Sequence, residues 1–366
     1  MAEWTTGELG TFITLKRGYD LPQQKRKNGS IPIFSSSGIS GSHNESMVKA
    51  PGVITGRYGT IGQVFFADAD FWPLNTTLYV EDFHGNDPQF IYYFLKTIEW
   101  EKFTSASAVP GINRNTVHKE VVTIPDKATQ KSIAEALALL DKKITANCKI
   151  NDNLQQQMAA LFDSWFVKYV PFGGSCPSDW HEADIYSIAD IIYGAPFASK
   201  LFNTTGEGKP IIRIRDLKDQ QFATYTTEHH PKGYLLQHGD IVVGMDGEFR
   251  PYIWANDEAW LNQRVCVFAN KRQYGKAFLY FTIKPLLYRI EQTQVATTVI
   301  HIGKKDYDAF RFMLPSADVL DRFDEITAPM ISRIVSNGLE NMRLAALRDT
   351  LLPKLISGEL DVSDLT

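Results

Sequence analysis

Residues 130–168 read QKSIAEALALLDKKITANCKINDNLQQQMAALFDSWFVK, and their apolar positions recur in alternating steps of four and three residues. This heptad spacing predicts one long amphipathic helix with a single apolar seam. A helix of that length spans roughly 55–60 Å, so it needs a partner helix along its length. The predicted seam consists of Ile133, Leu137, Leu140, Ile144, Asn147, Asn151, Leu154, Met158, Leu161 and Trp165.

A second stretch, residues 321–360, repeats this pattern as DRFDEITAPMISRIVSNGLENMRLAALRDTLLPKLISGEL. In both stretches two asparagines four residues apart interrupt the seam. Buried asparagine weakens a helix pair but fixes its register, because only one alignment lets the amides meet. We therefore expect an antiparallel coiled coil; the alternative is two unrelated helices, each packed on its own domain. The second seam is predicted at Phe323, Ile326, Met330, Ile334, Leu344, Leu347 and Leu351, and the register residues are Asn147, Asn151, Asn337 and Asn341.

Length and composition limit the class of protein. A chain of 366 residues exceeds the usual size of one core, so two domains are expected besides the helices. Three widely spaced cysteines support neither a disulfide framework nor a zinc site. Without an apolar run of membrane-spanning length or a signal peptide, we expect a cytoplasmic protein with no membrane partner. The net charge of −4 restricts any DNA-binding surface to a local patch.

The chain repeats itself in the order domain, helix, domain, helix. Residues 52–62, GVITGRYGTIG, correspond to residues 239–249, GDIVVGMDGEF, and WPLN at 72–75 corresponds to WLN at 260–262. Strand-like runs and turns surround one helix in each half. We expect an α+β chain in which two mixed α/β domains are separated by the paired helices, with a pseudo-twofold internal repeat. The expected segments are 1–128, 129–170, 171–317 and 318–366.

Motifs for catalysis are lacking. An adenine methyltransferase needs a glycine-rich loop for S-adenosylmethionine and an Asn/Asp-Pro-Pro-aromatic motif, but DPQF at 87–90 lacks the second proline. Asp246 and Glu248 have no accompanying catalytic lysine, and the His229–His230 pair lacks zinc spacing, so we interpret them as loop residues. We expect a non-catalytic chain without a metal or cofactor of its own.

The two helical stretches resemble the conserved regions of the specificity subunit of bacterial type I restriction-modification systems. WPLNTTLYV (72–80), SASAVPGINRNTV (105–117) and GKPIIRIRDL (208–217) resemble its target-recognition domains. The resemblance implies two such domains, each reading one half of a split, asymmetric site in double-stranded DNA. It also implies that the helices dock two methylation subunits, which bind S-adenosylmethionine, and that nuclease-translocase (restriction) subunits join them. Asn341, Met342 and Arg343 stand where the first helix has Gln157 and Met158, so the two docking faces need not be equivalent.

Base reading requires Arg, Lys, Asn, Gln and hydroxyl groups on loops that enter a groove. Arg57 and Arg250 stand out, because each lies in the corresponding glycine-containing turn of its repeat, where a backbone can approach DNA closely. The DNA-binding candidates are Lys25, Arg26, Lys27, Ser36, Arg57, Tyr58 and Arg114 in the first domain, and Lys200, Arg213, Arg215, Arg250, Tyr252, Arg264 and Lys304 in the second.

An aromatic cluster at the end of the first helix is larger than a helix seam needs. Phe162, Trp165 and Phe166 are therefore candidate partner contacts, since aromatic anchors are typical of interfaces; the alternative is local core. For the whole chain, two other functions stay open: a self-contained DNA methyltransferase or nuclease, and a coiled-coil scaffold that binds only protein.

Overall fold

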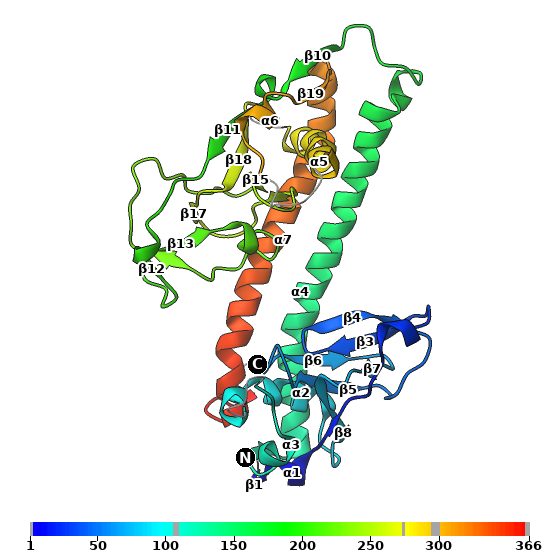
Figure 1. Cartoon of the computed structure of the whole chain (residues 1–366), viewed down its shortest axis with the longest axis vertical. Coiled ribbons are helices and arrows are strands. Elements are labelled where there is room, and N and C mark those ends of the chain that lie inside the picture. Colours follow the sequence, from blue (N-terminus) through cyan, green and yellow to red (C-terminus); the bar gives the residue numbers. More distant parts are fainter. Residues whose placement is uncertain (1–2, 105–109, 273–274, 294–300, 363–366) are drawn as a thin grey trace. The chain divides into compact units, whose positions relative to one another are not determined.

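The computed structural model describes residues 3–104, 110–272, 275–293 and 301–362. They form two compact units: unit 1 combines residues 1–142 with 344–366, and unit 2 comprises residues 143–343. The two long helices, α4 (Lys127–Phe162) and α7 (Ala317–Ser357), each contribute one part to each unit (Figure 1). The expected mixed α+β architecture with two sheet-containing parts and long helices is confirmed.

Unit 1 is built on short strands. β2 (Thr14–Arg17), β8 (Thr77–Asp82), β5 (Gly52–Gly56) and β6 (Val64–Ala67) form an antiparallel sheet in that order. β4 (Gly38–His43), β3 (Ile31–Ser35) and β7 (Trp72–Pro73) form a second sheet, in which β3 and β7 are parallel. β1 (Trp4–Glu8) pairs with β9 (Val121–Pro125), which leads directly into α4. The helices that join these strands are α1 (Leu9–Phe12), α2 (Pro88–Lys96) and α3 (Arg114–Val117).

The start of α4 is capped by Asp126. Its Oδ1 accepts hydrogen bonds from the backbone N–H groups of Ala128 (3.0 Å) and Thr129 (3.1 Å). These bonds hold the pKa of the Asp126 carboxyl below its usual value. Asp126 is therefore the N-cap of α4. At its other end α4 continues into a π-helical turn, Asp163–Val167.

Unit 2 has strand orders that parallel those of unit 1. β11 (Ala189–Tyr193), β18 (Val265–Asn270), β15 (Ile241–Gly244) and β16 (Pro251–Ile253) form an antiparallel sheet in that order. β12 (Phe202–Asn203), β14 (Tyr225–Thr226), β13 (Lys209–Ile212) and β17 (Trp260–Leu261) form another, in which β13 and β17 are parallel. β10 (His181–Asp184) pairs with β19 (Arg311–Leu314), which precedes α7. Two further helices are α5 (Lys276–Thr293) and α6 (Lys304–Tyr307).

The core of each unit includes side chains from the long helices. In unit 1, Leu137 of α4 and Leu355 of α7 are fully buried in one cluster with Phe90 of α2. In unit 2, Met158 of α4 and Phe323 of α7 are fully buried in a cluster that contains residues of β15, β18 and α5. Neither set of sheets therefore encloses its core without the helices.

Amide groups join α4 and α7 within unit 2. Asn147 Nδ2 donates to Asn341 Oδ1 at 2.9 Å, and Asn337 Nδ2 donates to Asn151 Oδ1 at 2.8 Å. Asn147 Nδ2 also donates to Glu340 Oε2 at 2.7 Å. Rising residue numbers on α4 meet falling numbers on α7, so the helices run in opposite directions here. The four asparagines predicted to meet are in contact.

In unit 1 the two helices are joined by an ion pair. Arg348 Nη1 of α7 lies 2.6 Å from Asp141 Oδ1 of α4, and Tyr93 OH of α2 donates to Asp141 Oδ2 at 2.6 Å. Asp141 of α4 thus binds both α7 and α2 within unit 1.

The predicted seam of α7 is wrong at two positions. Ile326 is 43% exposed and Leu347 is 46% exposed, whereas the neighbouring Thr327 is buried and Arg348 is paired with Asp141. Thr327 Oγ1 donates to the Phe323 carbonyl at 2.9 Å, so its polar group is satisfied inside the seam. Selection by apolar character therefore picked the residue beside the one that faces inward. The inward positions keep the four-three spacing as Phe323, Thr327, Met330, Ile334, Asn337, Asn341, Leu344, Arg348, Leu351 and Leu355.

Candidate nucleic-acid interface

In unit 1, the loop that follows β5 lies against the segment that leads into α3. The Arg57 N–H donates to the Thr76 carbonyl (2.8 Å), and the Ile112 N–H donates to the Arg57 carbonyl (3.1 Å). Tyr58 and Gly111 form an isolated antiparallel bridge. A Cβ at Gly111 would lie 2.2 Å from the Tyr58 ring, so only glycine permits this approach. We call residues 57–63 and 110–114 loop site 1.

The side chains of loop site 1 suit nucleic-acid contact. The half-buried Arg57 guanidinium lies 4.5 Å from the centre of the Tyr58 ring, and its Nε donates to the Ile112 carbonyl at 3.3 Å. Arg114 is exposed at the first position of α3. The turn that holds Ser36 lies beside the loop, since a Cβ at Gly59 would be 3.4 Å from Ser36 Oγ. A cation, a ring and a hydroxyl group therefore share one surface.

Unit 2 has the same backbone arrangement after β15. The Met245 N–H donates to the Arg264 carbonyl (2.8 Å), and the Ile302 N–H donates to the Met245 carbonyl (2.9 Å). Asp246 and His301 form the isolated antiparallel bridge. We call residues 245–250, Arg264 and residues 301–304 loop site 2.

The side chains of loop site 2 form a charged cluster. His301 Nδ1 lies 2.6 Å from Asp246 Oδ1, and Arg264 Nη1 lies 3.9 Å from the same oxygen. The His301 and Arg264 side chains are 55% and 56% exposed, and Arg264 has a left-handed backbone with φ +68°. A strained, exposed cation at a loop is typical of a binding surface.

Arg57 and Arg250 lie in corresponding turns of the two units but not at equivalent positions. The backbone bonds of the two loop sites pair Arg57 with Met245 and Tyr58 with Asp246. Arg250 bonds instead to Glu291 of α5, with Nη2 donating to Oε1 at 3.1 Å, and this bond lowers the pKa of Glu291. The guanidinium of Arg250 is thus already occupied within unit 2.

Several other basic candidates make contacts outside the loop sites. The Arg26 side chain donates to the Ser40 carbonyl of β4 (3.2 Å), with exposed Lys25 and Lys27 on either side. Arg213 bonds Asp216 (3.2 Å) and Thr224 within unit 2.

Two other candidates of unit 2 differ in their surroundings. Lys200 is exposed in a short 3-10 turn. Tyr252 lies within β16 opposite Val242, so it is a half-buried strand residue rather than a loop residue.

Arg215 and Lys304 lie close to loop site 2. The turn Ile214–Asp216 packs on the end of β15, because a Cβ at Gly244 would be 3.1 Å from Ile214 Cγ2. The Arg215 side chain is 69% exposed. Lys304 begins α6, as Arg114 begins α3, and its Nζ lies 2.9 Å from both carboxylate oxygens of Asp308.

The predicted partner contacts lie in the core of unit 2. Phe166 is 9% exposed, and its ring centre lies 4.8 Å from that of Phe323 and 5.0 Å from that of Phe278. Phe162 and Trp165 also contact Phe323. These rings fill the space between α4, α7 and α5. We therefore interpret them as core residues.

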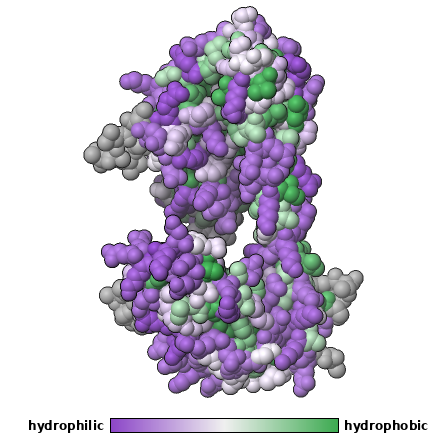
Figure 2. Space-filling view, turned by 90° about the vertical axis from the view of Figure 1, so that its right-hand side faces the viewer, coloured by the Kyte–Doolittle hydropathy of each residue, from purple (hydrophilic) through white to green (hydrophobic). Residues whose placement is uncertain are grey.

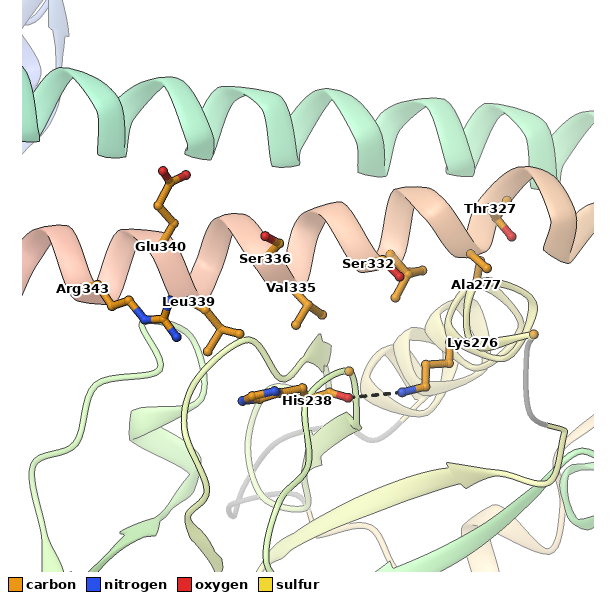
Figure 3. Close-up of a pocket in the computed structure, with 14 residues that line it drawn as sticks. His238, Lys276, Ala277, Thr327, Ser332, Val335, Ser336, Leu339, Glu340 and Arg343 are labelled. Atoms are coloured by element: carbon orange, nitrogen blue, oxygen red, sulfur yellow. Dashed lines mark hydrogen bonds between the residues drawn. The ribbon is translucent and has the colours of Figure 1, made fainter.

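A cavity of about 690 Å³ lies in unit 2 between α7 and the start of α5. Figure 3 shows Val335 and Leu339 turned toward His238, while Glu340 points toward α4. Lys276 Nζ donates to the His238 carbonyl at 3.4 Å, and burial lowers the pKa of this lysine. The carboxylate that lines this cavity, that of Glu340, is already bound to Asn147 and Lys143. Across the described residues no group of three His, Cys, Asp or Glu side chains could hold a metal ion.

Sequence reasoning missed His301 and assigned Asp246 to an ordinary loop. The signal was the repeat itself: GINRNTV at 111–117 aligns with HIGKKDY at 301–307, which places Gly111 opposite His301. The predicted repeat did not include this segment. Residues 105–109 of the quoted motif SASAVPGINRNTV lie outside the described residues.

Comparison with known families matches residues 1–156 and 177–345 to the type I restriction modification DNA specificity domain. The chain belongs to this family. Family membership makes DNA recognition, rather than methyl transfer or cleavage, the role of the chain. In the described residues, no helix has the length and apolar character needed to span a membrane.

Relatives and a solved structure agree with this assignment. The chain is 30% identical over 195 residues to the type I restriction enzyme EcoBI specificity subunit of Escherichia coli, covering 52% of this chain and 41% of that relative. It is 22% identical over 395 residues to the HindI specificity subunit of Haemophilus influenzae, covering 82% and 84%. The fold is similar to the type I S subunit from M. genitalium, with a TM-score of 0.61, 18% identity, and coverage of 97% and 96%.

Proposed function

We propose that this chain is the non-catalytic specificity subunit of a type I restriction-modification complex and reads a bipartite site in double-stranded DNA. One observation carries the proposal: the same backbone bonds frame loop sites 1 and 2, while their side chains differ. Arg57 and Tyr58 in one site are replaced by Met245 and Asp246 in the other. A shared frame with different chemistry suits two half-sites of different sequence.

The proposed architecture is an internal repeat with pseudo-twofold symmetry. Its segments are residues 1–128 and 171–317 as target-recognition domains, and residues 129–170 and 318–366 as the conserved helices. The strand orders β2-β8-β5-β6 and β11-β18-β15-β16 support the repeat. The contacts of Asn147 and Asn151 with α7 support an antiparallel coiled coil whose register these amides set.

Within this proposal the candidate residues have different roles. We assign base or groove contacts to the loop-site residues Arg57, Tyr58, Arg264 and Lys304, and phosphate contacts to exposed cations away from the loops. The loop-site group also includes Ser36, Arg114 and Arg215, and the phosphate group comprises Lys25, Arg26, Lys27 and Lys200. Arg213, Arg250 and Tyr252 maintain the fold.

The partners in this proposal are two methylation subunits, which carry S-adenosylmethionine, and restriction subunits, assembled in the cytoplasm. Large apolar side chains exposed on the helices are suited to the contact, and they replace the buried aromatic cluster as candidates. Leu139 (65% exposed) and Leu347 lie on the helices of unit 1, and Ile150 (40% exposed) and Ile326 on those of unit 2. Figure 2 shows one face of the molecule, which is mostly hydrophilic with hydrophobic residues interspersed.

Selection of methylated sites tests the function. The chain is purified with its methylation partner and incubated with S-adenosylmethionine and a random DNA library, and modified molecules are sequenced. We expect a split motif with two unrelated halves. A single uninterrupted motif, or modification independent of sequence, would contradict the proposal.

Two binding assays separate the alternatives. The isolated chain should not bind S-adenosylmethionine, whereas a self-contained methyltransferase would. It should retain DNA with a steep dependence on salt, which a scaffold for protein alone would not show.

A further inference from the structure

We propose that His301 reads one base pair in the half-site of unit 2, and that Asp246 positions its ring for this contact. The inference rests on the proposed function and adds a specificity-determining pair to it. The His301 side chain is 55% exposed. In the isolated bridge of its loop site His301 stands where Gly111 stands in unit 1. The two half-sites therefore meet an imidazole in one unit and no side chain in the other.

The tautomer of His301 follows from its partner. A carboxylate only accepts hydrogen bonds, so the nitrogen that lies 2.6 Å from Asp246 Oδ1, Nδ1, must carry the proton. In the neutral ring Nε2 then has a free lone pair and acts as an acceptor. Arg264 Nη1 lies 3.9 Å from the same carboxylate oxygen, so among the described residues Asp246 and Arg264 are the charged side chains near the His301 ring.

An acceptor at the tip of an exposed side chain selects among bases. In the major groove the exocyclic amino groups of adenine and cytosine donate, whereas guanine O6 and N7 and thymine O4 accept. Nε2 of neutral His301 therefore fits adenine or cytosine and leaves the acceptors of guanine or thymine unpaired. The backbone bond between Ile302 and Met245 holds the segment in place, so little ordering is needed on binding.

The experiment measures methylation rates on the selected site and its single-base variants. Four complexes are compared: wild type, His301→Ala, His301→Gln and Asp246→Asn, with His181→Ala, an exposed histidine of β10, as a matched control. We expect wild type to prefer adenine or cytosine at one position of the unit 2 half-site. His301→Ala should reduce that discrimination by about 5- to 30-fold, as for the loss of one hydrogen bond, and leave the other half-site unchanged.

The other two variants test the chemistry. Glutamine contacts adenine through both amide atoms, so His301→Gln should shift the preference toward adenine. An asparagine amide can accept from or donate to Nδ1, so Asp246→Asn should weaken discrimination at the same position while circular dichroism stays native. Unchanged discrimination in His301→Ala, or an equal loss on every sequence, would overturn the inference, the latter by marking a phosphate contact. Full discrimination in Asp246→Asn would remove the role of Asp246. If wild type shows no split site, the proposed function fails as well.

Discussion

At the scale of single residues, Arg57 and Arg250 differ in the bonds that their side chains make within their units. The sequence predicts Arg57 and Arg250 in corresponding turns, and the backbone bonds place Arg250 five residues beyond the position that corresponds to Arg57. Periodicity and glycine content could locate the turn that follows each strand. They could not align the two turns, because the alignment depends on which distant segment, 110–112 or 301–302, closes each loop.

Alanine at these two arginines should have different effects. Arg57→Ala should cost about 1–3 kcal/mol of binding at the half-site of unit 1 and relax base preference there. Arg250→Ala breaks the bond to Glu291, so it should lower the melting temperature of unit 2 without changing base preference. Competition binding on both half-site libraries distinguishes the variants. Relaxed preference in Arg250→Ala would contradict the assignment.

A buried carboxyl group in unit 2 makes stability depend on pH. Asp324 is 5% exposed, both carboxylate oxygens lack a hydrogen-bond partner among the described residues, and burial raises the pKa to about 6. The folded state thus favours the neutral form, and stability falls as pH rises from about 4 through 6. Asp324→Asn should raise the free energy of unfolding by about 2–3 kcal/mol at pH 7 and by almost nothing at pH 4. Urea denaturation at both pH values tests this, and equal gains would refute it.

At the scale of elements, the long helices were the part most open to prediction. The heptad spacing placed the first helix at 130–168, close to α4 and its π-helical turn, and the asparagine spacing identified side chains that do meet. The inward position of Arg348 could not be found in this way. A charged residue enters a seam only where a partner such as Asp141 is present, and that partner lies more than two hundred residues away.

The Asn151–Asn337 contact should give a non-additive pair of substitutions. Asn151→Leu leaves the amide of Asn337, which is 1% exposed, without its acceptor and should cost about 1–3 kcal/mol. Replacing both residues by leucine removes the unpaired group and should restore or exceed the original stability. Chemical denaturation of wild type, Asn151→Leu, Asn337→Leu and the double variant gives the coupling energy. Additive losses would show that the amides do not act as a pair.

A substitution in the core part of α4 and its π-helical turn should impair folding, whereas a substitution on the exposed surface of α4 should impair assembly. Phe166→Ala opens space among Phe323, Phe278 and Trp180 and should cost about 3–5 kcal/mol of stability. Ile150→Ser changes an exposed side chain, so stability should move by no more than about 0.5 kcal/mol while binding of the methylation subunit weakens. Thermal unfolding and co-purification test the two together. Normal folding of Phe166→Ala would show that the ring is not core.

At the scale of the whole molecule, a graft from a relative that is meant to change one half-site should replace a whole unit rather than the recognition domain alone. Met158, Phe323 and Ile334 of the long helices belong to the core of unit 2, so a graft of residues 180–315 leaves part of that core behind. A graft of residues 143–343 from a relative keeps core and asparagine pairs together.

The longer graft should therefore change one half-site at normal stability, whereas the shorter graft should change the same half-site with a lower melting temperature. Site selection and thermal unfolding of both chimaeras test this. A change in both half-sites would contradict the division into two units.

Unit 1 is discontinuous in sequence, and this affects the order in which the chain can fold during synthesis. Leu137 and Ile133 are made long before Leu352 and Leu355, which complete their cluster. At about 5–20 residues per second, the ribosome needs roughly 10–40 seconds to make the intervening unit 2. During that time the first recognition domain carries an uncovered apolar helix face. The domain that is translated first therefore becomes complete last, and its apolar helix face stays open to aggregation until α7 has been made.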